Sequence, residues 1–496
     1  MMNEREKKIL TDRLIPVPRK IDFRDGEPFP LTEKCPVRIA VSSGQEKIGE
    51  KVPELFRSFW GVTPELRLAQ ESVPAQAFPG SYAVKIRSDL LEIEAEAFDG
   101  VLNAMKTLRQ LAEVTRNTAA LQGHFLVPCD IEDSPAMEFR GIHLCIFPET
   151  PLWDIEKQIR LAAYHKFNYA VIECWGIFPF DSHPEFCWAE KQLDKQALKG
   201  LILLGRELGI TLIPQFNLLG HAAAARSISG KHAILDFHPE LQPLFEPEGW
   251  TWCLSNPETR RILTDLVTEL HEFFGNPPFF HIGCDEADNI GTCFECRRAS
   301  LKDLVRDHIQ FFRDLFAARN ARVIMWHDML IERGDPRWRG YTACRLPEHD
   351  LGDLHKELPK DIIIADWQYG YYKPNEDDPE PTWPTSRFFK EAGFQVVVCP
   401  WINPDGTISL GRLAAKEKLF GMLETTWHKN HGPDFARIYC MAAYASWNPA
   451  ANPGVTLSTR LAASHHLRQV GWDMGVTEYA MTGWNLNQVD AGNYPN

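Results

Sequence analysis

The sequence predicts an α/β protein, a (β/α)8 TIM barrel preceded by a small α+β accessory domain. From residue 140 onward, short continuous apolar runs alternate with amphipathic helical segments. Continuous runs are typical of parallel strands, because helices cover both faces of a parallel sheet. There are eight runs, each followed by enough chain for a helix, as this barrel requires. A doubly wound open sheet is the alternative, but no glycine-rich phosphate loop follows any run.

The segment before the barrel has a different pattern. Residues 90–97 (LLEIEAEA) alternate apolar and polar side chains, as a half-buried strand does. In residues 100–114, apolar side chains recur at helical spacing: Val101, Ala104, Met105, Leu108 and Leu111. We therefore expect an accessory domain over residues 1–135 and a barrel with a C-terminal helical extension over residues 136–496.

The eight apolar runs give the expected barrel strands in chain order. They are residues 140–146, 168–174, 210–216, 278–284, 322–326, 361–367, 394–399 and 420–427. Between the second and third runs, residues 195–209 predict a helix that ends at a glycine. The sequence SNPE at residues 255–258 predicts a capping box that starts another helix.

Polar and aromatic side chains collect where the expected strands end, which is where barrel enzymes carry their catalytic groups. They are Glu173, Asn217, His221, Asp285, Glu286, Trp326, Asp328, Asp366, Trp367, Tyr369, Trp401 and Trp427. Four of them are tryptophans at four successive strand ends. Indole rings suit the apolar faces of a sugar, so these tryptophans predict the wall of a sugar subsite.

The adjacent acids Asp285 and Glu286 end the fourth apolar run. Two carboxyl groups in one apolar pocket cannot both ionise freely, so the pKa of one is raised and the other stays an anion. A neutral Glu can protonate a leaving oxygen, and the anion can stabilise developing positive charge. Glycoside hydrolysis requires this division of labour.

Each of these residues also has a structural interpretation. The acidic pair can be a solvated turn, His221 a buried structural group, and the tryptophans part of the core. Glu173 can pair with a Lys or Arg, and Asp328 can cap the helix that follows it. The position of the acidic pair after a buried run, with other polar strand ends around it, favours catalysis.

Charge and hydropathy exclude some partners and locations. The formal net charge of −14 argues against nucleic acid as a partner. The chain has no apolar run of about 18 residues, so no membrane span is expected. The N-terminal sequence MMNEREKKIL has no apolar signal core, which predicts a cytoplasmic protein, or a secreted or periplasmic one whose signal peptide has been removed. The oligomeric state is left open.

The twelve cysteines are expected to be mostly reduced and buried, because the chain is too long to need a disulfide framework. Cys293 and Cys296 form a C-x-x-C pair without a second pair of ligands. Both a metal site and a reduced structural pair stay open for these two residues.

These motifs resemble those of family 20 glycoside hydrolases, the β-N-acetylhexosaminidases. Residues 281–286 (HIGCDE) are similar to the H-x-G-G-D-E signature of that family. Residues 81–113 look like the accessory domain that precedes the barrel there, and residues 139–144 look like its first strand.

Two further segments resemble the bacterial exo-β-N-acetylglucosaminidase branch of the family. Residues 165–188 supply a Glu after the second strand, and residues 213–224 contain an N-x-x-G-H turn after the third. The resemblance covers roughly residues 80–430, with residues 399–415 matching only in part.

The resemblance implies a retaining reaction in which the substrate's own 2-acetamido oxygen attacks C1 and forms an oxazolinium ion. Asp285 would hold the acetamido N–H, and Glu286 would protonate the leaving oxygen and then activate water. His221 and Glu173 would belong to a polar network around this pair. Tyr369 would bind the acetamido oxygen, and the four tryptophans would wall the sugar subsite. The resemblance implies no metal or organic cofactor.

Two positions depart from the family pattern. Cys284 stands where the signature has its second glycine. An Arg that usually grips the sugar hydroxyls after the first strand is missing, since residues 145–151 (CIFPETP) place Pro148 near that position. A hexosaminidase for a substituted sugar, such as a sulfated one, and a non-catalytic sugar-binding relative therefore stay open. So do the preference for GlcNAc or GalNAc and the natural glycan.

Overall fold

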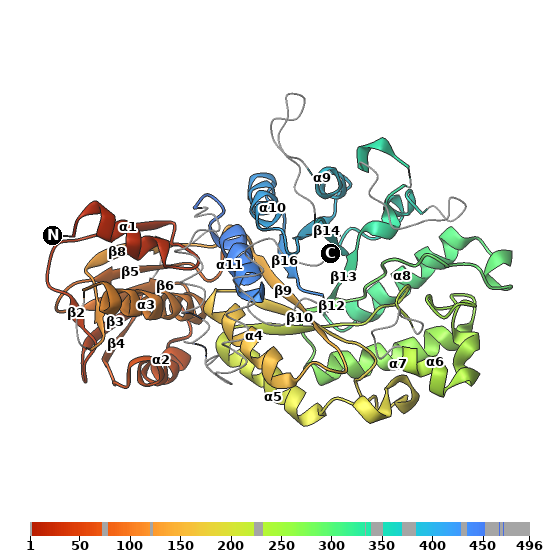
Figure 1. Cartoon of the computed structure of the whole chain (residues 1–496), viewed down its shortest axis with the longest axis horizontal. Helices are drawn as coiled ribbons and strands as arrows, with labels where there is room; N and C mark the ends of the chain where they lie inside the picture. Colours follow the sequence, from red (N-terminus) through yellow and green to blue (C-terminus); the bar gives the residue numbers. More distant parts are fainter. Residues whose placement is uncertain are drawn as a thin grey trace.

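The computed structural model describes residues 2–71, 78–119, 123–222, 232–332, 334–338, 351–369, 383–427 and 434–451, with residues 466 and 470. Within them, eight parallel strands close into a barrel in the order β9 to β16, with β16 pairing back onto β9. This confirms the predicted (β/α)8 fold. Figure 1 shows the barrel beside a separate N-terminal sheet.

All eight barrel strands lie at the predicted apolar runs. They are β9 (Phe139–Ile146), β10 (Tyr169–Cys174), β11 (Thr211–Gln215), β12 (Phe279–His281), β13 (Arg322–Trp326), β14 (Ile363–Trp367), β15 (Gln395–Cys399) and β16 (Gly421–Thr425). β12 ends three residues before the predicted position. The chain leaves the extended conformation there, because Gly283 and Cys284 have φ angles of +63° and +70°.

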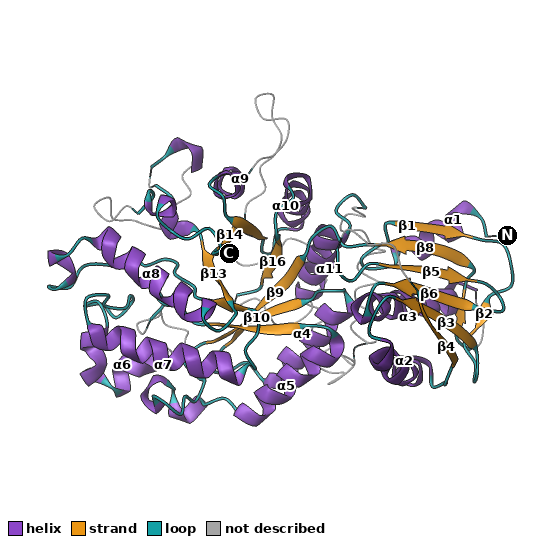
Figure 2. Cartoon of the chain, turned by 180° about the vertical axis from the view of Figure 1, so that it is seen from behind, coloured by secondary structure: helices purple, strands orange, loops and turns teal. Residues whose placement is uncertain are grey.

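Helices cover the outside of the barrel (Figure 2). They are α4 (Leu152–Tyr164), α5 (Lys195–Leu208), α6 (His232–Phe237), α7 (Pro257–Phe273), α8 (Leu301–Ala317), α9 (Pro384–Glu391), α10 (Pro404–Glu417) and α11 (Asp434–Trp447). Short 3-10 helices join them: η1 (Pro184–Phe186), η2 (Ala189–Lys191), η3 (Pro239–Leu244), η4 (Cys296–Arg298), η5 (Asp328–Leu330), η6 (Pro336–Trp338) and η8 (Leu354–Lys356). None of the helices in the described ranges is long and apolar enough to cross a bilayer.

One of the two helix-end predictions is confirmed and the other is wrong. α5 ends at Gly209, which takes the left-handed conformation with φ +79°. The predicted capping box at Ser255 does not form, because the N-cap of α7 is Asn256, whose side chain accepts the Glu258 N–H at 3.0 Å. Pro257 sets this boundary, since its fixed φ and missing N–H suit the first helical position.

One apolar side chain from each strand forms a packed layer inside the barrel. These are Phe139, Val171, Ile213, Phe279, Ile324, Ile363, Val397 and Leu423. Side chains alternate along a strand, so Glu173 and Trp367 lie on the same inner side as this layer, closer to the strand ends. The strand-end side chains therefore pack directly above this layer.

The N-terminal part of the chain is a mixed sheet in the order β1-β8-β5-β6-β3-β4. Its strands are β1 (Lys20–Phe23), β3 (Pro36–Val41), β4 (Glu65–Gln70), β5 (Tyr82–Ile86), β6 (Leu91–Ala95) and β8 (Cys129–Asp133). β2 (Phe29–Pro30) and β7 (Phe125–Leu126) form a separate pair, and the helices are α1 (Glu4–Asp12), α2 (Gln45–Trp60) and α3 (Phe98–Ala119). The predicted strand and helix correspond to β6 and α3.

A buried polar cluster joins this sheet to the barrel. Lys166, which follows α4, donates to Asp133 at 2.9 Å and to the Tyr82 hydroxyl at 2.8 Å. Trp447, the last residue of α11, donates to the same carboxylate at 2.8 Å and packs in the core of the N-terminal sheet. In both views, α11 lies between the sheet and the barrel (Figures 1 and 2).

The domain boundary near residue 135 stays a prediction. The predicted C-terminal extension falls outside the described residues after residue 451, except for residues 466 and 470.

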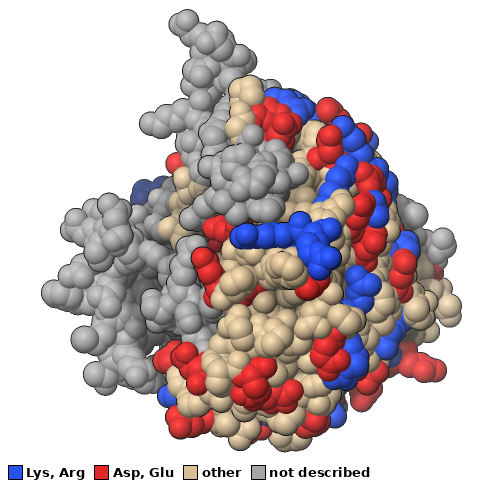
Figure 3. All heavy atoms as spheres, turned by 90° about the vertical axis from the view of Figure 1, so that its right-hand side faces the viewer, with Lys and Arg blue, Asp and Glu red and all other residues tan. Residues whose placement is uncertain are grey.

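On the face at the right of Figure 1, acidic and basic side chains are interspersed (Figure 3). On α8, acidic and basic side chains also form ion pairs, such as Arg313–Asp314 and Arg306–Asp303.

Candidate active site

Asp285 and Glu286 lie in the turn that follows β12 at the carboxyl end of the barrel. The Asp285 side chain is 6% exposed and the Glu286 side chain is 35% exposed. Glu286 has a φ of +43°, which few L-residues adopt. The pair is thus a buried acid beside a more accessible one, and not the fully solvated turn of the structural interpretation.

His221 lies against both acids. Its Nε2 is 3.3 Å from Asp285 Oδ2 and 3.5 Å from Glu286 Oε2. It comes from the N-x-x-G-H turn after β11, and the Trp250 ring packs 4.5 Å from it, centroid to centroid. The three predicted residues that carry acid–base chemistry therefore meet in one place.

Two glycines allow the turns after β11 and β12 to interlock. A Cβ on Gly220 would lie 2.2 Å from the Asp285 carbonyl oxygen, and one on Gly283 would lie 1.8 Å from Asn217 Oδ1. The Leu218 N–H also donates to the Ile282 carbonyl at 3.0 Å. Only residues without a side chain fit this close approach, so the glycines fix how His221 faces the acidic pair.

Asp328 is fully buried behind the acidic pair. Its Oδ2 accepts the Glu286 backbone N–H at 3.0 Å, and its Oδ1 accepts the Trp367 indole N–H at 3.2 Å. Burial, and then the neighbouring charge of Asp285, raises the pKa of Asp328 well above its ordinary value. The helix-cap interpretation of Asp328 is wrong, because η5 has His327 at its N-cap and no side-chain cap.

Trp250 was not found by the sequence reasoning. Its indole N–H donates to the Glu286 carbonyl at 2.5 Å, and its own carbonyl accepts the Ala222 N–H at 3.0 Å. It lies in the segment between β11 and α7, where no strand-end rule applies. Together, Asp328 and Trp250 hold the Glu286 backbone at both its N–H and its carbonyl.

Glu173 points into the barrel mouth from β10. Its Oε1 accepts from Asn217 Nδ2 at 3.0 Å, and its Oε2 lies 3.6 Å from His143 Nε2. His143, on β9, is a second residue that the sequence reasoning missed, although it lies on the inner face of its strand. Glu173 therefore contacts an amide, an imidazole and, at 3.8 Å, the Cys145 thiol, as in a polar network.

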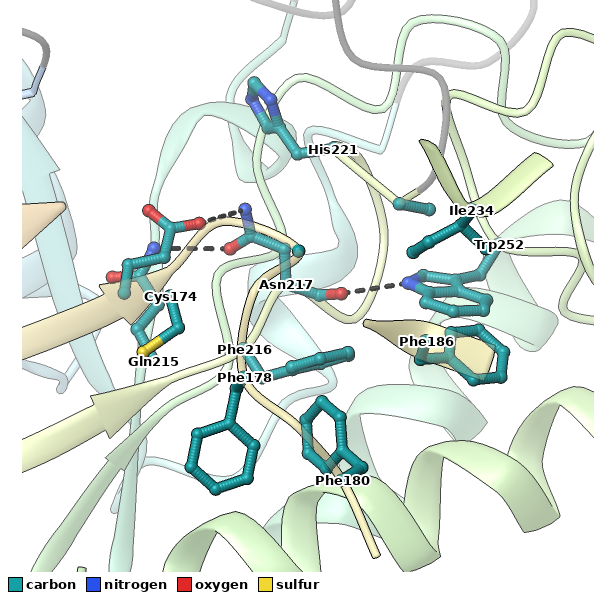
Figure 4. A pocket seen from close by; sticks show the side chains of 13 residues that line it. Cys174, Phe178, Phe180, Phe186, Gln215, Phe216, Asn217, His221, Ile234 and Trp252 are labelled. Atoms are coloured by element: carbon teal, nitrogen blue, oxygen red, sulfur yellow. Dashed lines mark hydrogen bonds between the residues drawn. The ribbon is translucent and has the colours of Figure 1, made fainter. Parts of the chain in front are cut away.

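A cavity lies next to this network. In Figure 4, Asn217 lies between Gln215 on one side and Trp252 on the other. The Asn217 side chain is hydrogen-bonded to Glu173 and Gln215, and its backbone carbonyl accepts from the Trp252 indole. The far side of the cavity is apolar: Phe178, Phe180, Phe186, Phe216 and Ile234. His221 borders it but the acidic pair does not, so this cavity lies beside the acids and not over them.

The predicted aromatic residues form one contiguous group. Tyr369 stacks on Trp367 at 5.2 Å, lies 5.3 Å from Trp401, and accepts the Trp427 indole N–H at 2.7 Å. Trp326 is fully buried and packs 5.6 Å from Trp427, so it lies beneath the group. Burial raises the pKa of Tyr369 well above its ordinary value.

Asp366 is the second-last residue of β14 but faces away from this group. It accepts from the hydroxyls of Thr385 and Ser386 at the start of α9. A strand-end position alone therefore does not place a side chain at the barrel mouth, because alternate residues face the helices.

Two groups of described residues bring potential metal-ligand atoms within 4.8 Å of one another. One is His143, Cys145 and Glu173 inside the barrel, and the other is Glu246, Cys253, Cys293 and Cys296 outside it. The first group is part of the polar network around Glu173.

Comparison with known proteins extends the resemblance of the motifs. The family model for the glycosyl hydrolase family 20 catalytic domain matches residues 187–378, a span that contains His221, the acidic pair and Tyr369. "Beta-hexosaminidase 1" of Coccidioides posadasii is 24% identical over 327 residues, covering 58% of this chain and 50% of that protein. "Beta-hexosaminidase" of Porphyromonas gingivalis is 22% identical over 406 residues, covering 72% and 50%. The chain thus spans about half the length of these curated relatives.

Solved structures share the fold over most of the chain. The chitobiase of Flavobacterium johnsoniae superimposes with a TM-score of 0.69 at 17% identity, covering 100% of this chain and 77% of that one. The β-N-acetylhexosaminidase of Bacteroides fragilis gives a TM-score of 0.65 at 17% identity, covering 92% and 96%. The motifs, the family model and the sequence relatives agree, and this chain is similar to the family 20 glycoside hydrolases over residues 187–378.

Proposed function

We propose that the protein is a retaining exo-β-N-acetylhexosaminidase that removes terminal β-linked GlcNAc or GalNAc through an oxazolinium intermediate. The observation that carries this proposal is the arrangement of the acids: Asp285 is buried, Glu286 is partly exposed, and His221 lies within 3.5 Å of both. The names of the relatives, which are beta-hexosaminidases, support the same reaction.

In the first step, Asp285 accepts a hydrogen bond from the acetamido N–H and turns the acetamido oxygen toward C1. The oxygen forms a bond to C1 while the glycosidic bond breaks, and Glu286 gives its proton to the leaving oxygen. In the second step, Glu286 takes a proton from water, which attacks C1 and reopens the ring. Two inversions at C1 leave the product with the configuration of the substrate.

The surroundings of the two acids fit these roles. A buried Asp285 can bind an amide N–H without competition from water, and a partly exposed Glu286 can exchange its proton with solvent between the steps. Asp328 and Trp250 hold the backbone of Glu286, which keeps its carboxyl group aimed at one position. Trp367, Trp401 and Trp427 supply apolar surface for a sugar ring.

The main test is hydrolysis of a chromogenic β-N-acetylglucosaminide. We expect wild-type turnover, and a loss of about 10²-fold or more in kcat for Glu286→Gln, because the amide cannot donate the acid's proton. Glu272→Gln, at an exposed position on α7, is the matched control and should keep full activity. Equal rates for Glu286→Gln and the wild type would exclude Glu286 as the general acid.

A second experiment tests the part played by the substrate's amide. N-acetylglucosamine thiazoline mimics the cyclised intermediate, so we expect it to inhibit far more strongly than free GlcNAc. Asp285→Asn should weaken this inhibition more than it weakens the binding of GlcNAc. Equal affinity for thiazoline and GlcNAc in the wild type would contradict substrate assistance, and binding without turnover would favour a non-catalytic sugar-binding protein.

The Arg that usually grips the sugar hydroxyls is missing after β9, so we also compare substrates that carry substituents at those hydroxyls. The same assay with an N-acetylglucosaminide sulfated at the C3 or C4 hydroxyl tests the alternative specificity. A higher kcat/KM for the sulfated substrate would replace the unsubstituted sugar in our proposal.

A further inference from the structure

Four potential metal ligands converge outside the barrel mouth, from two segments that are distant in the sequence. Glu246 and Cys253 come from the segment between η3 and α7, and Cys293 and Cys296 follow the acidic pair. Their ligand atoms all lie within 4.8 Å of one another. Glu246, Cys253 and Cys296 are buried and Cys293 is partly buried.

The sulfur positions suit a shared metal better than a disulfide. Cys253 Sγ lies 3.6 Å from Cys293 Sγ and 3.8 Å from Cys296 Sγ. A disulfide bond requires an S–S distance of about 2.05 Å, and it would join only two of the three cysteines. Tetrahedral zinc with Zn–S bonds of about 2.3 Å separates its sulfurs by about 3.8 Å, close to both observed values.

Glu246 is fully buried and already held in place by hydrogen bonds. Its Oε2 accepts the Cys293 N–H at 2.5 Å and the Thr292 hydroxyl at 3.2 Å, and its Oε1 accepts the Gly291 N–H at 3.3 Å. Within the described part of the chain, no ion pair includes this carboxylate. A buried carboxylate beside three thiols is costly by itself, and a bound cation would compensate its charge.

The backbone around the cluster is ordered by its own hydrogen bonds. Phe245 and Trp252 form an isolated bridge, and the Glu246 N–H donates to the Thr251 carbonyl at 2.8 Å. Residues 245–252 thus form a small hairpin with Glu246 and Cys253 near its open end. The Cys296 N–H donates to Cys293 Sγ at 3.3 Å, which orients that sulfur.

We propose that Glu246, Cys253, Cys293 and Cys296 form a structural zinc site. Three thiolates and one carboxylate complete a tetrahedral set, so no position stays open for water or substrate. The thiols release their protons when the metal binds. The site ties the 245–252 hairpin to the segment after Glu286, and this hairpin carries Trp250, which holds the Glu286 carbonyl. The proposed zinc site does not depend on which reaction the protein catalyses.

Metal analysis of the purified, reduced protein tests the proposal without any activity measurement. We expect about one zinc per chain in the wild type, and a loss of more than about 10-fold in bound zinc for Cys253→Ser and Cys296→Ser. Cys187→Ser is the matched control, since Cys187 is partly buried but lies outside the cluster, and it should keep its zinc. Wild-type protein that neither contains zinc nor takes it up after reduction would overturn the proposal.

Cobalt gives a readout that does not depend on a variant folding correctly. Wild-type protein stripped of metal and loaded with Co²⁺ should show thiolate-to-cobalt charge-transfer bands and the intense visible bands of tetrahedral cobalt. Weaker charge-transfer bands are expected for Cys293→Ser, with little change for Glu246→Gln, which removes an oxygen ligand and not a sulfur. A spectrum of octahedral Co²⁺ without thiolate bands, or a Cys253–Cys293 disulfide found by mass spectrometry of the native protein, would refute the site.

Discussion

At the scale of single residues, backbone strain concentrates at the candidate site. His221, Cys284, Glu286 and Trp427 all have positive φ, between +43° and +70°. Each such residue costs on the order of 1 kcal/mol or more, and strain of this kind is typical of functional sites. The φ of +70° at Cys284 explains why the family signature has glycine at this position, since glycine adopts positive φ without strain. Here the Cys284 side chain is fully buried and its Sγ donates to the Ile282 carbonyl at 3.4 Å.

Gly220→Ala should disrupt the site through one methyl group. The new Cβ would lie 2.2 Å from the Asp285 carbonyl oxygen, so the two interlocked turns must separate. We expect at least about a 10-fold loss of activity, since small misplacements of catalytic groups are costly. Gly200→Ala on α5 is the control, because nothing lies within 4 Å of its Cβ and helix propensity favours Ala by about 1 kcal/mol. Unchanged hydrolysis by Gly220→Ala would show that the interlock does not position the acids.

The sequence predicted the residues of this site better than their orientations. Asp285, Glu286 and His221 were identified and do meet, because they follow neighbouring strands of a closed barrel. The strand-end rule could not find Trp250, which reaches the site from a hairpin far from any strand end. Asp366 shows the opposite failure, since it lies next to the end of β14 but faces α9.

At the scale of secondary-structure elements, α8 supports the turn that carries His221. His308 on α8 is buried, and its Nε2 donates to the Leu218 carbonyl at 2.9 Å. Burial lowers the pKa of His308 from 6.5 to about 3. The helix therefore holds the N-x-x-G-H turn through a neutral imidazole.

This histidine makes stability depend on pH. Below pH 6.5 the unfolded chain binds a proton that the folded protein excludes until about pH 3, so the free energy of unfolding falls as the pH decreases across this window. The contribution is about 1.4 kcal/mol per pH unit. Urea unfolding between pH 7 and 4 should show a shallower pH dependence for His308→Gln than for the wild type. The partly exposed His238→Gln is the control, and equal slopes for wild type and His308→Gln would contradict the prediction.

Element positions followed from the sequence where burial alone decides them. The barrel strands are covered on both faces, so each is a continuous apolar run that is easy to locate. Element ends depend on local chemistry instead. Pro257 moves the start of α7 past Ser255, and Gly283 and Cys284 end β12 early through positive φ.

At the scale of the whole molecule, the Lys166–Asp133 pair connects the N-terminal sheet to the barrel. Both side chains are fully buried, and Tyr82 and Trp447 complete their hydrogen bonds. Burial lowers the pKa of Lys166. Removing one charge of such a pair leaves the other without compensation.

Lys166→Met should therefore destabilise the protein by about 3–5 kcal/mol. The double variant Lys166→Met/Asp133→Asn should lose less, because Asn keeps an acceptor for the Trp447 indole and carries no charge. Urea unfolding of the two variants and the wild type measures the difference. Equal loss in the single and double variants would mean that the stranded charge does not cause the destabilisation.

Trp447 occupies the core of a sheet whose strands precede it by more than 300 residues. A fragment ending near residue 135 would lack the indole that fills this space, so its hydrophobic interior would open to water. The N-terminal sheet should then fold into a stable, non-aggregating protein only when α11 is supplied with it, for example by a circular permutation that brings the two segments together.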